Sequence, residues 1–147
     1  MRSVLQSAVR SFNRENHIKN VMQGEWVHLR DDRGAELPGI RGRIGACAMT
    51  VRGYDIGVDL IEMQPGAAFP LHVHPGDHIL FVLHGRGIVH VDGVDHRVAV
   101  GETIYVPAEY HHGVKTILDE PEPFTFIAFG YPHKHLEAAD RMTVVGP

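Results

Sequence analysis

Short runs of apolar, β-forming residues, each closed by Gly, Pro or Asp, dominate the sequence from Ile56 to Phe129. Such runs, separated by turn residues, are typical of β-strands. Because no stretch with helical periodicity separates them, the pattern predicts an all-β sandwich or barrel. Asp92-Gly93, between two of the runs, is a β-hairpin signal. The predicted strands are Ile56–Met63, Phe69–Val73, His78–Leu83, Gly87–Val91, His96–Val100, Thr103–Val106, Gly113–Leu118 and Pro123–Phe129.

The two flanks of this central region are less regular. Apolar residues at helical spacing over residues 4–12 predict a short N-terminal helix, and residues 134–142 could form a short C-terminal helix. Early strands are expected near Trp26–Leu29 and over Ile44–Val51. A chain of 147 residues fits one domain. We expect it to comprise a helix and edge-strand segment packed on the barrel (1–55), the barrel itself (56–130) and a C-terminal tail (131–147).

Composition argues against several classes of function. The formal net charge is −4, and no run or stripe of Lys and Arg is present, so nucleic acid is not an expected partner. No apolar stretch reaches the roughly 18 residues of a membrane span, so no membrane association is expected. The single Cys47 cannot form an internal disulfide, and no secretory signal is recognised. We therefore expect a cytoplasmic protein.

Histidine is unusually abundant, with 12 residues in the chain. Neutral imidazole is the commonest protein ligand for transition metals. His72 and His74 are two residues apart, a spacing that points both side chains to one face of a strand. His78 follows Pro75-Gly76-Asp77, which can turn the chain into a partner strand and return a third imidazole. His112 is a fourth candidate, later in the chain.

One segment resembles the first sequence motif of the cupin superfamily. That motif runs glycine, five residues, His-x-His, three or four residues, glutamate, six residues, glycine. Its spacing is kept here, but a histidine stands where the family has its glutamate ligand. The matching residues are Gly66, His72, His74, His78 and Gly85.

A later segment resembles the second cupin motif. That motif runs glycine, five residues, Pro-x-Gly, two residues, histidine, three residues, asparagine. Glu109 stands where glycine is usual, and Thr116 stands where asparagine is usual. The matching residues are Gly101, Pro107, Glu109, His112 and Thr116.

The resemblance implies a double-stranded β-helix, the jelly-roll barrel of small RmlC-like cupins. It implies that His72, His74 and His112 are metal ligands, with His78 as a fourth ligand through imidazole in place of carboxylate. The alternative for His78 is an imidazole lying above a three-histidine site. The cofactor would be one divalent transition-metal ion, Fe, Mn, Ni, Zn or Cu, which the sequence does not identify. Small cupins are commonly dimers, so the resemblance also implies a homodimer.

Neutral imidazole ligands leave a divalent ion with its full charge, which favours substrates that chelate through anionic oxygen. We therefore expect a mononuclear non-haem metal oxygenase of the dioxygenase type that acts on a small oxygen-chelating molecule, with iron among the candidate metals. Two alternatives stay open: a lyase, decarboxylase or isomerase that uses the ion as a Lewis acid, and a non-enzymatic binding or sensing module. Glu109 could be a catalytic general base, or simply a solvated carboxylate.

The other histidines and the aromatic residues are expected to be structural. His111 neighbours His112 and would face away from the site, while His133 has no partner spacing and is expected to be solvated. The phenylalanines of the strand runs are expected to fill the core; they are Phe69, Phe81, Phe124, Phe126 and Phe129.

Overall fold

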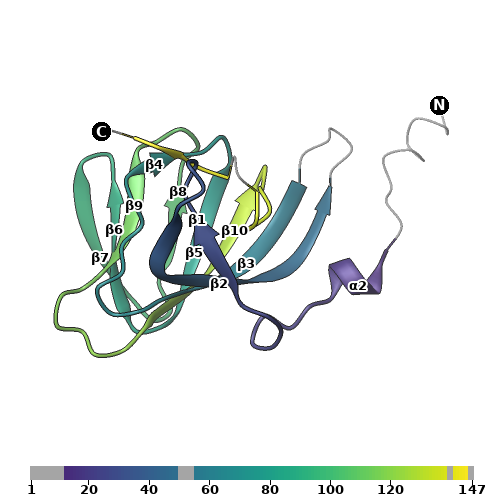
Figure 1. Cartoon of the computed structure of the whole chain (residues 1–147), viewed down its shortest axis with the longest axis horizontal. Helices are drawn as coiled ribbons and strands as arrows, with labels where there is room; N and C mark the ends of the chain where they lie inside the picture. The colour runs from purple at the N-terminus through teal and green to yellow at the C-terminus, as the bar shows by residue number, and fades with distance from the viewer. Residues whose placement is uncertain (1–11, 50–54, 139–140, 146–147) are drawn as a thin grey trace.

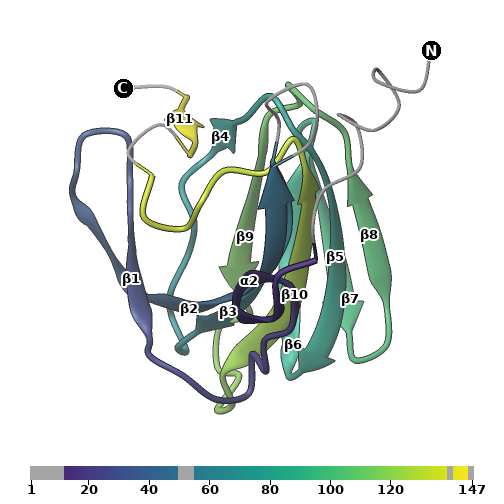
Figure 2. The same cartoon turned by 90° about the vertical axis from the view of Figure 1, so that its right-hand side faces the viewer.

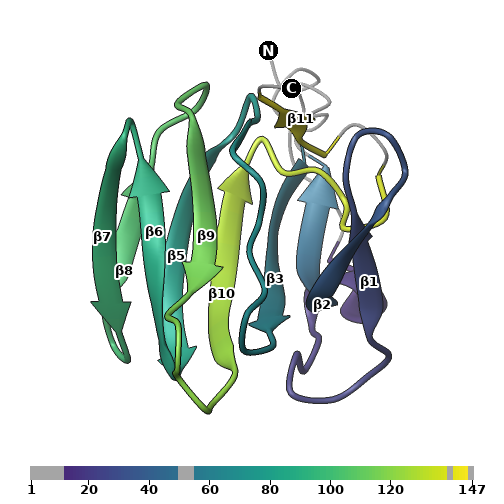
Figure 3. The same ribbon diagram turned by 60° about the vertical axis from the view of Figure 1, so that its left-hand side comes forward.

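A computed structural model gives the fold and describes residues 12–49, 55–138 and 141–145. Two antiparallel β-sheets face each other (Figures 1 and 3), in the strand orders β1-β2-β3-β10-β5-β8 and β11-β4-β9-β6-β7. This architecture confirms the predicted all-β jelly roll. The elements are α2 (Arg14–His17), β1 (Val27–Arg30), β2 (Glu36–Met49), β3 (Asp55–Met63), β4 (His72–Val73), β5 (Asp77–His84), β6 (Arg86–Val91), β7 (Val94–Ala99), β8 (Thr103–Val106), β9 (His112–Thr116), β10 (Phe124–Tyr131) and β11 (Thr143–Val144).

The predicted strands of the central region are all present as β3 to β10, with some ends shifted. The Asp92-Gly93 hairpin between β6 and β7 is confirmed, because both residues have positive φ, 49° and 82°, as a type I′ turn requires. β2 is longer than predicted, because Gly42 and Gly45 do not interrupt it. A Cβ at Gly45 would lie 2.3 Å from the backbone oxygen of Val58 on β3, so these glycines permit close approach of the strands.

The prediction that Pro75-Gly76-Asp77 turns the chain into a partner strand was wrong. β4 pairs with β9 and β11, whereas β5 pairs with β10 and β8. The segment between β4 and β5 therefore carries the chain from one sheet to the other. This crossover separates His78 from the strand that holds His72.

Of the helices expected at the two ends of the chain, the N-terminal one is not tested by the structure, and the C-terminal one is not found in the described residues. The N-terminal helix over residues 4–12 falls almost wholly outside the described residues, and α2 follows it as a single turn. Residues 134–138 and 141–142 are irregular rather than helical and lead into β11, which pairs with β4 (Figure 2). Within the described part of the chain, no helix is long and apolar enough to cross a membrane.

The hydrophobic core lies between the two sheets, and strand parity decides which aromatic residues enter it. Phe124 and Phe126 of β10 are buried in the core, and Phe69 packs against it. Phe81 and Phe129 remain 41% and 38% exposed, so their predicted place in the core was wrong. Both belong to the opposite parity of their strands and face outward from the six-stranded sheet.

We predict that Gly87→Ala destabilises the fold through a clash with Phe124. A Cβ at position 87 would lie 2.4 Å from Cε1 of the Phe124 ring, which is only 1% exposed and has little room to move. The free energy of unfolding should fall by about 1–3 kcal/mol, as for other overpacked cores, measured by urea denaturation. Phe124→Leu in the same chain should relieve part of the loss; strictly additive effects would contradict the clash.

Candidate metal centre

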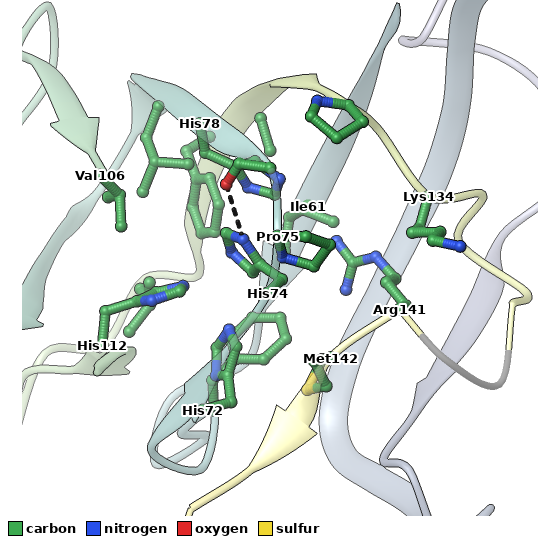
Figure 4. A pocket seen from close by; sticks show the side chains of 17 residues that line it. Ile61, His72, His74, Pro75, His78, Val106, His112, Lys134, Arg141 and Met142 are labelled. Atoms are coloured by element: carbon green, nitrogen blue, oxygen red, sulfur yellow. Dashed lines mark hydrogen bonds between the residues drawn. The ribbon is translucent and has the colours of Figure 1, made fainter. Parts of the chain in front are cut away.

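Three buried imidazoles converge at one end of the space between the sheets. His72 on β4 and His112 on β9 are direct cross-strand partners, and His74 follows β4. Each offers a ring nitrogen, and these three atoms lie within 4.8 Å of one another. The ring centroid of His112 is 4.2 Å from that of His72 and 4.5 Å from that of His74 (Figure 4). These three residues could hold a metal ion.

The orientation of the three rings is set by backbone hydrogen bonds. In each ring Nδ1 lies within hydrogen-bond distance of a carbonyl oxygen, which can only accept, so Nδ1 carries the proton. The lone pair of Nε2 is then available, as in imidazoles that ligate a metal. The bonds join His72 to Pro70 (2.7 Å), His74 to Gly76 (2.9 Å) and His112 to Tyr110 (2.9 Å).

The environment of the three imidazoles keeps them neutral. Burial lowers the pKa of His72 well below its ordinary value, and the charge of His112 lowers it further. The same two causes, burial first, lower the pKa of His74 to about 4. Burial also lowers the pKa of His112. Because a metal ion binds only the neutral form of imidazole, the residues fit a divalent ion without prior loss of protons at neutral pH.

His78 lies beside this group but is not one of the three. Its ring is stacked on that of His74, with centroids 4.0 Å apart and an interplanar angle of 22°. Its Nε2 lies 2.9 Å from the position that a Cβ on Gly130 would occupy. Burial, followed by the charge of His74, lowers the pKa of His78 to about 2. This placement favours an imidazole packed against a three-histidine site, and the fourth-ligand role stays a prediction.

Glu109 stands in the loop before His112 with its side chain exposed to solvent. Its backbone N–H donates a hydrogen bond to the carbonyl of His74 at 3.0 Å, which connects the loop to the main chain of this candidate ligand. The residue has a φ of 64°, in the left-handed region that favours the glycine usual here in cupins. It does not line the pocket described below. Its role as a catalytic base stays a prediction.

We predict that Glu109→Gly stabilises the protein by about 0.5–1 kcal/mol. Glycine removes the free-energy cost of holding a residue with a side chain in the left-handed region. This gain exceeds the entropic cost of the extra flexibility that glycine gives the unfolded chain. Thermal denaturation of metal-free protein should show the gain. Glu109→Gln, the matched control, keeps the strain and should leave stability unchanged. Equal stability of the two variants would contradict the strain argument, and lost turnover in Glu109→Gln would indicate a catalytic carboxylate.

A buried pair next to the three histidines was missed by the sequence analysis. Nε2 of His133 lies 2.8 Å from Oδ2 of Asp59, and the two residues are 5% and 1% exposed. The prediction that His133 is solvated was therefore wrong. Its ring lies over Gly57 and Gly130, which are cross-strand partners on β3 and β10 and leave room for it. Because the pairing of Gly57 with Gly130 depends on strand register, local sequence patterns do not predict the space that these two glycines leave for His133.

The three imidazoles open onto a pocket that is also lined by His78, by apolar side chains and by two cationic ones. Lys134 and Arg141 of the C-terminal segment also line it, and the guanidinium of Arg141 points toward Pro75 (Figure 4). Sequence analysis missed both, because the path of that segment depends on the pairing of β11 with β4. The apolar wall comprises Ile61, Leu80, Val106, Val114, Phe126 and Ala128.

Comparison with known proteins adds a family match and a curated relative. A family model described as a cupin domain matches residues 59–129. Dimethylsulfoniopropionate lyase DddW of Ruegeria pomeroyi is 31% identical over 86 residues, which are 58% of this chain and 54% of that protein. The chain thus spans about half the length of the curated relative it matches.

Solved structures resemble the fold over most of the chain. KdgF from Halomonas sp. has a TM-score of 0.62 at 21% identity, covering 80% of this chain and 95% of its own. An RmlC-like cupin from Shewanella frigidimarina has a TM-score of 0.63 at 22% identity, covering 81% and 93%. At these identities the likeness concerns the fold alone. The family match, taken with the two facing sheets, shows that residues 59–129 of the chain form a cupin domain.

Proposed function

We propose that this cupin is a metal-dependent enzyme that acts on a small oxygen-chelating anion. The ion would be held by Nε2 of His72, His74 and His112. The observation that carries this proposal is their shared hydrogen-bond pattern, in which each Nδ1–H is taken by a carbonyl and each Nε2 is left available. Three such buried nitrogens within 4.8 Å of one another form a donor set suited to a divalent transition metal.

Lewis-acid chemistry, as in a lyase, decarboxylase or isomerase, is the version of this proposal that we favour. A divalent ion bound here would polarise a substrate oxygen and acidify the substrate. The protein's own contribution is to keep the imidazoles neutral and to line the space beside them with apolar side chains that limit access of water. The curated relative is a lyase by name, which supports this choice.

The dioxygenase expected from the sequence stays the second candidate. An imidazole donor set also suits iron, and Glu109, which is exposed and does not line the pocket, supplies no carboxylate base there for a lyase reaction. Dependence on dioxygen separates the two candidates, since only the dioxygenase consumes it.

The test begins with metal analysis of protein purified from metal-replete medium without added metal. Turnover is then measured with and without oxygen on a panel of small carboxylates, diketones and catechols. Stoichiometric metal with undiminished anaerobic turnover supports the Lewis-acid enzyme, and oxygen uptake coupled to turnover supports the dioxygenase. Protein that takes up no divalent metal would overturn the proposal.

The homodimer and the cytoplasmic location stay predictions. What supports a homodimer is the outer face of the six-stranded sheet, where large apolar side chains lie exposed. Sedimentation analysis of the purified chain would decide the oligomeric state. These side chains include Ile79, Phe81, Tyr105, Phe129 and Tyr131.

A further inference from the structure

A permanent cation faces the three histidines across the pocket. Arg141 belongs to the C-terminal segment just before β11, and its side chain lines the same pocket as His72 and His74. Figure 4 shows the guanidinium reaching from that segment toward Pro75.

The described residues balance the charge of Arg141 only in part. The buried Asp59 raises the pKa of Arg141 by attraction, against the larger lowering by burial. The Asp59 carboxylate, however, already lies 2.8 Å from His133. Among residues 12–49, 55–138 and 141–145, no acceptor forms a hydrogen bond or ion pair with the guanidinium. A guanidinium has five N–H donors, and leaving them unpaired in a pocket is costly.

A divalent ion on the three histidines makes this imbalance larger. The imidazoles are neutral, so the ion would keep its double charge while facing a guanidinium across a poorly solvated space. An anion lying between the two would offset the repulsion and satisfy the N–H donors. The planar fork of a guanidinium matches both oxygens of a carboxylate.

The remaining walls limit what else such an anion can carry. Ile61, Leu80 and Phe126 line the pocket beside the imidazoles and offer no polar atoms from their side chains. A short aliphatic body can lie on this surface, whereas a charge placed against these three side chains would be desolvated without a partner.

We propose that Arg141 binds the carboxylate of a small aliphatic monocarboxylic acid, and so sets the substrate class of the site proposed above. The inference rests on the proposed function only in treating this anion as a substrate, because binding of the anion can be measured without turnover.

Calorimetric titration with propionate tests this directly, with propionamide as the neutral probe of the same shape. Titrations are run on protein loaded with Co²⁺ and on metal-free protein, with metal content measured separately. We expect wild-type protein to prefer propionate over propionamide. Arg141→Gln should weaken propionate binding about tenfold or more, the effect of losing a charge-assisted hydrogen bond, and leave propionamide unchanged. Arg141→Lys, which keeps the charge but not the fork, should fall between.

Lys134→Gln is the matched control, since it removes the other cation of the pocket. It should weaken propionate less than Arg141→Gln does. Equal propionate binding by wild-type protein and Arg141→Gln would overturn the proposal, as would wild-type protein that binds no propionate in either form. If Arg141→Gln fails to fold, Arg141→Lys decides the outcome. Propionate binding in that variant as tight as in wild-type protein would overturn the two-point contact between the guanidinium and the carboxylate. Absence of metal uptake would overturn the proposed function, while the metal-free titration still decides the role of Arg141.

Discussion

Replacing His112 with alanine is expected to weaken binding of the divalent ion by more than about 100-fold. Loss of a partner that merely orients a ligand costs about 10–100-fold in metal affinity, and His112 is placed to be a ligand itself. It is buried, lies directly opposite His72 and presents Nε2, because Nδ1–H donates a hydrogen bond to the carbonyl of Tyr110. Competition with a chelator of known affinity would measure the loss.

His111→Ala is the matched control for this experiment. It removes the adjacent imidazole, which is exposed. Metal affinity should be unchanged in that variant, and a loss comparable to that of His112→Ala would show that the centre has been assigned to the wrong residue. His78→Ala, made in parallel, separates a fourth ligand from an imidazole stacked on His74: only a ligand would give a loss as large as that of His112→Ala.

Metal-free protein should lose several kcal/mol of stability between pH 7.5 and pH 5. Burial lowers the pKa of His74 to about 4 and that of His78 to about 2, whereas in the unfolded chain both titrate near 6.5. As the pH falls below about 6.5, these imidazoles therefore bind protons in the unfolded state but stay neutral in the folded state. The free energy of unfolding decreases with it, by about 2 kcal/mol at pH 5 for each imidazole that stays neutral.

Urea denaturation at intervals across this range, in the presence of a chelator, measures the effect. The lower limit of this pH range lies above the ordinary pKa of carboxylates, so carboxylates contribute little to the loss of stability. His78→Asn should show a smaller decrease, because it removes one of the buried imidazoles. Saturating metal should raise stability at every pH, since it binds the folded state alone. A metal-free protein equally stable at pH 7.5 and pH 5 would contradict the buried, neutral state of these rings.

Much of the fold and the core of the candidate site follow from local features of the sequence. Turn residues closing short apolar runs predicted β3 to β10, because strand formation and tight turns depend on neighbouring residues. The two-residue spacing of His72 and His74 placed both rings on one face for the same reason. His112 was a candidate as a further histidine, but only the resemblance to a family motif linked it to His72, 40 positions earlier.

The tertiary structure decided what depends on register and on the path between the sheets. The crossover after His74 places His78 against a ring face rather than among the three converging nitrogens. The pairing of Gly57 with Gly130 makes room for His133 beside Asp59.

The pairing of β11 with β4 draws the C-terminal segment over the pocket and delivers Arg141 to it. These contacts join residues far apart in the chain, so no periodicity or spacing records them. The sequence alone thus determined an all-β cupin with a histidine cluster. Only the folded chain decided which imidazoles converge and which cation faces them, because both are set by long-range strand pairing.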